Sequence, residues 1–323
     1  MLTHGQFAGA IVPLLLAAVT VAQAAQPAWP DKPIRLVVGS AAGSGPDIIS
    51  RVMAERLYGV WGQRVVVDPR PGVAGLLSAD LVTRSAADGY TWMMMTSQLF
   101  IATTVYSTHK VDLARDFASI SLIGTVPFVL VVNPSVAKTI PELIEIAKKS
   151  PGTLRYGSAG AGGAEHLTGF LFGHLAGANI LHVPYKGIPQ ALADTVAREV
   201  HFSNAVLPVS MPFVQSGRLR ALGVTTRKRA TLLPEVPAVA ETLPGFEMFG
   251  WYSLVAPTGT PQNILVKVNA EVVKAVKEPQ FGEQLKSLGI DLVGNTRAEF
   301  DAFRRNETKR MGDIVKASGV DLK

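Results

Sequence analysis

Residues 34–45 have the sequence IRLVVGSAAGSG, and this stretch sets the fold class. Ile34–Val38 is a short run of β-branched and large apolar residues, which is typical of a buried strand. Gly39–Gly45 is a loop of glycine, serine and alanine, and a helix is predicted over Asp47–Leu57. A strand that leads through a glycine-rich loop into a helix is the repeating unit of α/β folds with a mostly parallel sheet.

The same alternation continues to the end of the chain. Further strands are predicted over Arg64–Val67, Thr91–Met95, Ile120–Ile123, Phe128–Val132, Leu154–Tyr156, His182–Val183, Val200–Ser203, Leu219–Val224 and Trp251–Val255. Further helices are predicted over Leu76–Arg84, Ile140–Lys149, Glu165–Ala176, Ile188–Arg198, Leu207–Gln215, Pro261–Val276, Gln280–Leu288 and Arg297–Ala317. The prediction is an α/β fold with two Rossmann-like domains.

The length of 323 residues is about twice that of a typical domain of roughly 150 residues, which favours two domains. We expect the second domain, residues 126–252, to be inserted into a first domain made of residues 25–125 and 253–323. The chain would cross between them near Ile123–Val132 and Phe249–Val255.

The first 24 residues are predicted to be a signal peptide. Phe7–Ala22 is an apolar run interrupted only by Pro13 and Thr20, and Ala22-Gln23-Ala24 behind it fits a signal-peptidase site. The run is too short to span a bilayer. We therefore expect a periplasmic protein without a membrane anchor; a buried helix is the alternative.

Composition excludes several functional classes. Hydrophobic residues make up 48% of the chain and charged residues 17%, so a disordered role is excluded. The chain has no cysteine, which excludes disulfides, thiolate metal sites and a cysteine nucleophile. The net charge is +6, but the basic residues are scattered and the densest run, residues 227–229, is only three long, so nucleic acid is not expected as a partner.

Two glycine-rich loops provide the candidate binding site. Gly39–Gly45 and Gly157–Gly163 both begin Gly-Ser-Ala, follow a predicted strand and precede a predicted helix. Their small residues let a ligand approach the backbone, and free N–H groups at a helix start attract anions. We expect the loops to face each other across a cleft and to bind a carboxylate or a phosphate. The predicted contacts are Ser40, Ala41, Ala42, Gly43, Ser44 and Gly45 in the first loop, and Ser158, Ala159, Gly160, Ala161, Gly162 and Gly163 in the second.

Five further residues are candidates for the same site, each with an alternative structural role: Asp47, Ser97, Lys186, Gly187 and Asn204. Asp47 follows Ser44 at capping-box spacing, so it either starts the helix or contacts the ligand. Lys186 is either a ligand contact or a solvated lysine. Asn204 follows Ser203 at a predicted strand end, where it either caps the next helix or reaches the cleft.

Motifs for catalysis are missing. The sequence has no G-x-S-x-G, no H-E-x-x-H, no P-loop and no full G-x-G-x-x-G, and no His/Asp/Glu spacing that suggests a metal. We expect neither a cofactor nor a metal, and binding rather than catalysis. A hydrolase would need a distant pair such as Ser158 with His166 or His182.

In order along the chain, seven segments resemble the Bug-type periplasmic solute-binding proteins, the receptors of tripartite tricarboxylate transporters. They are Pro71–Gly75, Asp88–Tyr90, Tyr156–Gly160, His182–Gly187, Leu219–Thr226, Leu233–Pro237 and Ala256–Pro261. The resemblance implies a fold like that of type II periplasmic binding proteins, a Venus-flytrap that closes on a small carboxylate and delivers it to membrane permease subunits. A monomer is expected, and a receptor that signals to a membrane sensor is the alternative.

The sequence departs from that family in two places. The first loop lacks the usual proline and aromatic residue, and Ser203-Asn204 replaces the usual Asp-Asn. The second change removes a carboxylate that would attract an amine, so we expect a ligand with one or two carboxylates and no ammonium group.

Overall fold

The computed structural model describes residues 1, 29–106, 108–286 and 288–322. The predicted signal peptide therefore lies outside the described residues, apart from Met1. Among the described residues, no helix combines the length and the apolar character needed to cross a bilayer.

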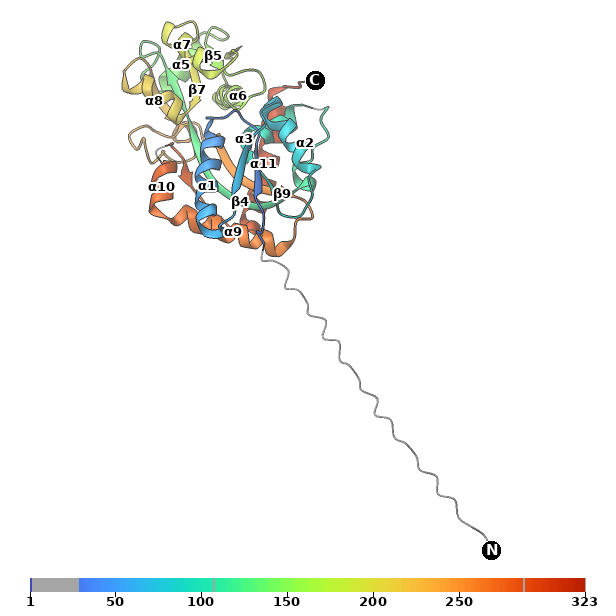
Figure 1. The fold of residues 1–323 in the computed structure, drawn as a ribbon. Helices are drawn as coiled ribbons and strands as arrows, with labels where there is room; N and C mark the ends of the chain where they lie inside the picture. The colour runs from blue at the N-terminus through green and yellow to red at the C-terminus, as the bar shows by residue number, and fades with distance from the viewer. Residues whose placement is uncertain (2–28, 107, 287, 323) are drawn as a thin grey trace.

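The described chain alternates strands and helices, which confirms the α/β prediction (Figure 1). The strands are β1 (Ile34–Val38), β2 (Val65–Pro69), β3 (Thr91–Thr96), β4 (Phe117–Val132), β5 (Arg155–Ser158), β6 (Leu181–Pro184), β7 (Phe202–Val206), β8 (Arg220–Val224), β9 (Phe249–Pro257) and β10 (Asp291–Leu292). The helices are α1 (Gly45–Trp61), α2 (Leu76–Thr83), α3 (Ser97–Val105), α4 (Leu113–Asp116), α5 (Ile140–Lys149), α6 (Ala164–Ala176), α7 (Ile188–Ala197), α8 (Leu207–Gln215), α9 (Gln262–Lys277), α10 (Pro279–Lys286) and α11 (Arg297–Ser318), with short 3₁₀ turns η1 (Val73–Gly75) and η2 (Val239–Glu241).

Strand β4 joins two groups of strands. The sheet order is β2-β1-β3-β9-β4-β7-β5-β6, with β8 and β10 also paired to β4. From Phe117 to Pro127, β4 pairs with β9, and from Phe128 to Val132 it pairs with β7. We call β1, β2, β3, β9, β10 and residues 117–127 of β4 the first lobe, and β5 to β8 with residues 128–132 of β4 the second lobe.

The prediction of two separate strands at Ile120–Ile123 and Phe128–Val132 was therefore wrong, because one strand of 16 residues covers both. Gly124 and Pro127 lie between the two predicted strands. Both are accommodated inside β4, and the pairing of β4 with β9 has register shifts at Ser119/Ser121 and Leu122/Gly124. The change of partner at Phe128 is compatible with the predicted domain boundary after residue 125, which stays a proposal.

Two helix starts illustrate how local sequence sets the boundaries. At α11, the Thr296 side chain accepts a hydrogen bond from Glu299 N–H, and the Glu299 carboxylate accepts one from Thr296 N–H, which is a capping box. At α5, Thr139 accepts from Glu142 N–H at 3.3 Å. Caps of this kind satisfy N–H groups that have no partner within the helix.

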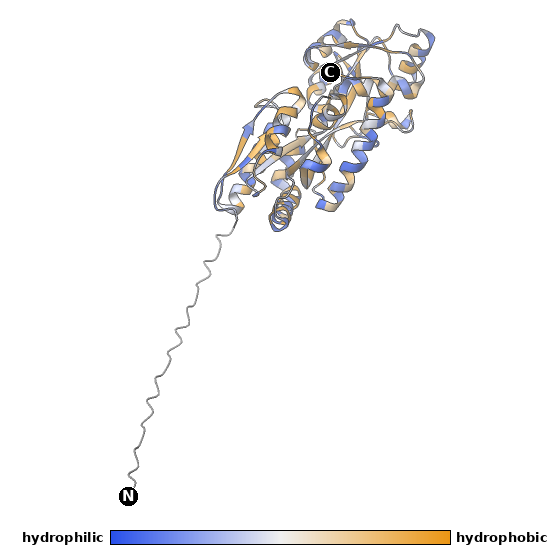
Figure 2. Cartoon of the chain, turned by 90° about the vertical axis from the view of Figure 1, so that its right-hand side faces the viewer, coloured by the Kyte–Doolittle hydropathy of each residue, from blue (hydrophilic) through white to orange (hydrophobic). Residues whose placement is uncertain are grey.

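The sheet is covered on both faces, and the two lobes share part of their core. Figure 2 shows apolar residues along the strands and polar residues on the outer turns of the helices. One buried cluster joins Ile101 of α3 and Met311 of α11 to Leu167 and Phe172 of α6. Helices α3 and α11 follow first-lobe strands, whereas α6 belongs to the second lobe, so apolar packing continues between the lobes.

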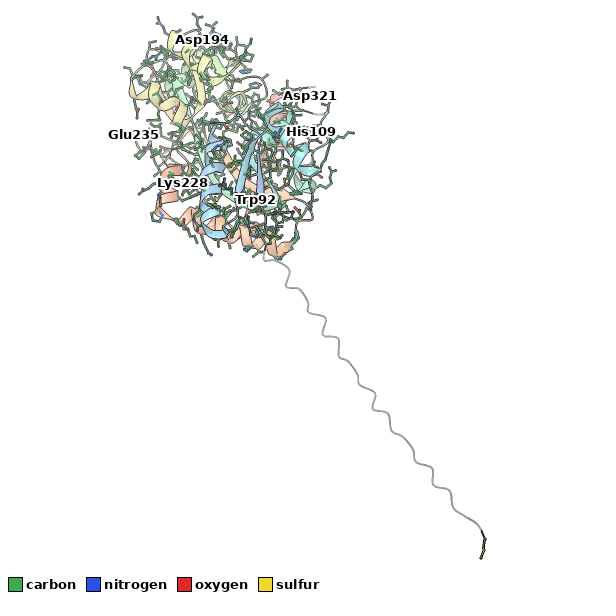
Figure 3. All side chains as sticks on the ribbon, in the orientation of Figure 1. Trp92, His109, Asp194, Lys228, Glu235 and Asp321 are labelled. Carbon is green, nitrogen blue, oxygen red and sulfur yellow. The ribbon has the colours of Figure 1, made fainter. Side chains whose placement is uncertain are left out.

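The C-terminal tail returns to α3. Tyr106 and Leu322 form a parallel β-bridge, and Figure 3 labels His109 and Asp321 on this side of the molecule. Val105 and Leu322 both lie beside Gly162, so the end of the chain packs against the second glycine-rich loop.

Candidate functional site

The first loop, residues 39–45, connects β1 to α1 and approaches η1 closely. A Cβ atom built on Gly39 would lie 2.8 Å from the Cα atom of Gly75. Real Cβ atoms do not approach a backbone atom so closely, so only glycine fits here. Ala41, Ala42 and Gly43 are exposed, which leaves the outer part of the loop open to solvent.

Asp47 holds the first loop in shape. Its side chain is buried, and its Oδ2 atom accepts hydrogen bonds from Gly43 N–H at 2.9 Å and from Arg51 Nε at 2.9 Å. Burial alone would raise the pKa of Asp47, but the hydrogen bonds from Arg51 and Gly43 and the charge of Arg51 hold it below its usual value. Asp47 therefore stabilises the loop and the start of α1.

The capping box predicted from Ser44 and Asp47 does not form. Ser44 is the N-cap residue of α1, but its side chain makes no capping bond, and Asp47 bonds to Gly43 instead of Ser44. The Oγ atom of Ser44 is buried and has no hydrogen-bond partner among the described residues. This unpartnered hydroxyl lies at the N-terminal end of α1, where an anion is favoured.

The second loop, residues 157–163, connects β5 to α6 and is held by Ser158. The Ser158 hydroxyl is buried; it donates to the Gly160 carbonyl at 2.9 Å and accepts from Gly160 N–H at 3.1 Å. It also lies 2.6 Å from Nε2 of His182. A hydroxyl has one proton to donate, so when Ser158 donates to Gly160, Nε2 of His182 must be the donor in this contact.

His166 and His182 both make hydrogen bonds to residues of the second loop. Their rings stack at 3.8 Å with an interplanar angle of 10°, and Nδ1 of His166 accepts from Gly162 N–H at 2.9 Å. Burial, together with the charge of His166, lowers the pKa of His182 to about 4. Burial also lowers the pKa of His166 and raises the pKa of the neighbouring Tyr156. Both imidazoles are therefore neutral at neutral pH.

A cavity of about 130 Å³ lies between the second loop and the first lobe. Its walls are formed by Ala74 of η1, by Gln98, Ile101 and Ala102 of α3, by Tyr106, and by Ala159, Gly160, Ala161, Gly162, Gly163 and Glu165. The structure thus places most of the predicted second-loop residues opposite the start of α3. Ser97 is the first residue of that helix, although it is not among the lining residues.

The first loop does not line this cavity but packs next to residues that adjoin it. Gly39 packs on Gly75 of η1. A Cβ built on Gly75 would in turn lie 3.8 Å from Leu99 of α3. Lys186 and Gly187 do not line the cavity either, and Lys186 is exposed. The structure therefore groups the second loop, η1 and α3, with the first loop adjoining them.

Asn204 lies inside a strand instead of ending one. β7 extends from Phe202 to Val206, so the predicted strand end at Ser203 was wrong. Ser203 bonds to Thr195 at 2.7 Å on one face of the strand. β7 pairs with β5 so that Gly157 is opposite Ser203, and Asn204 pairs with Leu130 of β4. Asn204 is fully buried, and neither its Nδ2 nor its Oδ1 has a hydrogen-bond partner among the described residues.

Three features of the site were not predicted. Ala74 lies in the Pro71–Gly75 segment, which was noted only for its family resemblance, and it borders the cavity. Glu165 was assigned only to a helix start. Tyr252 was not named as a site residue; its hydroxyl lies 3.3 Å from a Cβ built on Gly45, and burial raises its pKa to about 12. Among the described residues, no group of three or more His, Asp or Glu side chains could hold a metal ion.

Comparisons with known proteins identify the family of this chain. Residues 49–320 match the model of the tripartite tricarboxylate transporter family receptor. A protein from the tcbD-tcbE intergenic region of Pseudomonas sp. (strain P51) is 36% identical, covering 89% of this chain and 87% of its own. Protein BugT of Bordetella pertussis is 31% identical, covering 91% of this chain and 92% of its own.

A solved structure shows the same fold. The R. palustris protein Rpa4515, solved with adipate, is 33% identical and superposes with a TM-score of 0.79 over 91% of this chain and 99% of its own. The family match covers most of the chain, and the structural match covers nearly all of the described part. The chain therefore belongs to the Bug-type receptors of the tripartite tricarboxylate transporter family.

Proposed function

We propose that this protein is a periplasmic receptor that binds a small carboxylate between its lobes and delivers it to the membrane subunits of a tripartite transporter. The observation that carries the proposal is the amide of Asn204. It is fully buried in β7, and both its polar atoms lack partners among the described residues. Native proteins rarely leave a buried amide unsatisfied, because each such group costs about 1–3 kcal/mol. A ligand that supplies the missing hydrogen bonds explains it.

The two loops favour an anion. They lie at the N-terminal ends of α1 and α6, where free N–H groups and the helix dipole attract negative charge. Neither loop contains lysine or arginine, so the backbone must provide the charge complement. The similar Rpa4515 was solved with adipate, a dicarboxylate, which supports the same class of ligand here.

Binding would proceed by closure of the lobes. The ligand docks on one loop, and rotation about β4 and the chain entering β9 brings the other loop onto it and excludes water. Hydrogen bonds to a carboxylate strengthen when water leaves. Micromolar affinity needs about −8 kcal/mol, which several charged hydrogen bonds of about 1.5–3 kcal/mol each can supply after the costs of closure.

A hydrolase is the second candidate, because Ser158 and His182 are in contact at 2.6 Å. The arrangement argues against it. Ser158 is fully buried, so a substrate cannot reach its hydroxyl, and that hydroxyl is already bonded to Gly160 within its own loop. We therefore propose binding without turnover.

The cellular setting follows from the same proposal. Residues 1–24 would direct export and be removed, and residues 25–323 would act as a free monomer in the periplasm. The first domain would comprise residues 25–125 and 253–323, with residues 126–252 as the second.

Calorimetry on an Asn204 variant tests the proposal. Purified wild-type protein is titrated with linear C2–C6 mono-, hydroxy- and dicarboxylates, and the tightest ligand is measured again with Asn204→Leu. We expect at least tenfold weaker binding by the variant, together with equal or higher thermal stability, because an unsatisfied buried amide is removed.

Thr195→Val is the matched control. Thr195 is fully buried, and its hydroxyl bonds to Ala191 at 2.7 Å and to Ser203 at 2.7 Å on the opposite face of β7. We expect this variant to lose stability and keep its affinity. The proposal fails if no carboxylate binds the wild type, or if Asn204→Leu binds as tightly as Thr195→Val.

A further inference from the structure

The cavity between the lobes contains a carboxylate of the protein itself. Glu165 is the second residue of α6 and forms part of the cavity wall beside Gly163. Its Oε2 atom lies 3.5 Å from a Cβ built on Gly163, the N-cap residue. The carboxylate therefore occupies the N-terminal end of α6, where a ligand carboxylate would otherwise be favoured.

Asp47 and Glu165 are the acidic residues in the first turns of α1 and α6, but only Asp47 has a counter-ion. Asp47, in the first turn of α1, is neutralised by Arg51 through bonds of 2.9 and 3.0 Å. Within residues 29–106, 108–286 and 288–322, no ion pair joins Glu165 to a lysine, arginine or histidine. The other polar side chains of the cavity wall are the Gln98 amide and the Tyr106 phenol, which carry no positive charge.

The two ends of the binding region therefore differ in charge. At α1, the carboxylate of Asp47 is paired and the exposed loop remains available for an anion. At α6, an unpaired carboxylate would repel a second anion across a small cavity, where the dielectric is lower than in water. Burial raises the pKa of Glu165, since no counter-ion offsets the cost of its charge, and a second carboxylate in the cavity would add to that cost. A hydroxyl group at that end would instead donate a hydrogen bond to Glu165.

We infer that Glu165 is a specificity-determining residue, which orients the ligand with its carboxylate on the first loop and a neutral hydrogen-bond donor facing α6, and which disfavours a second carboxylate there. The inference rests on the proposed function and narrows it. The ligand class becomes a linear monocarboxylate with a hydroxyl or similar donor at its far end.

Chain-matched ligands test this inference by calorimetry at pH 7.5. The pairs are succinate with 4-hydroxybutyrate, glutarate with 5-hydroxypentanoate, and adipate with 6-hydroxyhexanoate. For the pair that binds best, the wild type should prefer the hydroxy acid by at least about tenfold. Glu165→Gln keeps the size of the side chain and removes its charge, so the preference should fall at least about tenfold through tighter binding of the dicarboxylate.

Glu283→Gln is the control, since Glu283 is an exposed residue of α10 and its replacement changes the net charge equally. It should leave the preference unchanged. The inference is overturned if the wild type binds the dicarboxylate at least as tightly as the hydroxy acid, or if Glu165→Gln preserves the wild-type preference. If neither protein binds any of the six acids, the proposed function fails as well, and the two failures are thus distinguishable.

Discussion

The hydroxyl oxygen of Ser158 lies 2.6 Å from Nε2 of His182, and the ring of His182 stacks on His166 at 3.8 Å. Through these contacts two neutral imidazoles support the second loop, since Nδ1 of His166 also accepts the N–H of Gly162. The shape of the loop therefore depends on both histidines staying unprotonated. Protonation of His166 at Nδ1 would remove the acceptor that Gly162 uses.

Stability should fall in acid because of this pair. The pKa of His182 is about 4 in the folded protein and 6.5 in its ordinary state, so the unfolded chain takes up a proton first as the pH falls. Folding free energy is therefore lost between about pH 6.5 and pH 4, by up to about 3 kcal/mol from this residue. Urea denaturation at pH 7.5, 6 and 5 measures the loss.

His182→Gln provides the comparison for the pH experiment. Its amide can still donate to Ser158, but it does not titrate. The variant should lose less stability than the wild type between pH 7.5 and pH 5. Equal losses in the two proteins would show that His182 is not buried in the neutral form.

Gly160 tests whether the second loop contacts the anionic ligand. Its φ of +140° is a backbone conformation that side chains rarely adopt, and a Cβ there would meet Tyr185 O at 3.7 Å. Gly160→Asp and Gly160→Asn impose the same size and the same strain but differ in charge. Because the ligand carries a net negative charge, Gly160→Asp should abolish binding, falling at least about tenfold below Gly160→Asn. Equal calorimetric affinities of folded variants would remove the loop from the binding site.

Gly39 tests the contact between the first loop and η1. Gly39→Ala places a methyl group 2.8 Å from Gly75, so the backbone must shift, at a cost of about 1–3 kcal/mol in stability. Because the loop moves with it, ligand affinity should fall too. Gly59→Ala in α1 is the control, since a Cβ there meets nothing within 4 Å. It should stabilise the helix by about 0.5–1 kcal/mol and leave affinity unchanged. If thermal melts gave Gly39→Ala and Gly59→Ala the same melting temperature, the close contact between Gly39 and Gly75 would not require glycine.

The order of apolar, glycine-rich and helical segments along the sequence was enough to predict the strand–loop–helix units that contain the two loops. In both lobes a short strand, a glycine-rich loop and a helix follow directly in sequence, so β1 with α1 and β5 with α6 could be recognised without tertiary information. Helix α3 could not, because its residues are buried on several sides and show no amphipathic period. Its role in the cavity wall depends on packing against α6, which sequence spacing does not encode.

Tertiary pairing also decided the details that sequence analysis got wrong. β4 continues through Gly124 and Pro127 because β9 pairs alongside it, and this pairing joins residues far apart in the chain. Asn204 was predicted to follow a strand that ends at Ser203, but β7 extends past it to Val206, and Asn204 is buried there. The position of the Glu165 carboxylate over Gly163 likewise depends on how α6 meets the loop.

Amide NMR of the ¹⁵N-labelled protein, titrated with the tightest-binding carboxylate from the calorimetric screen, examines whether one backbone loop from each lobe holds the ligand. We expect saturable shifts of the N–H signals in residues 40–45 and 159–163 with the same dissociation constant, while the signal of Lys186 moves little. Shifts confined to one of the two loops, or centred elsewhere in the molecule, would contradict a site formed by both lobes.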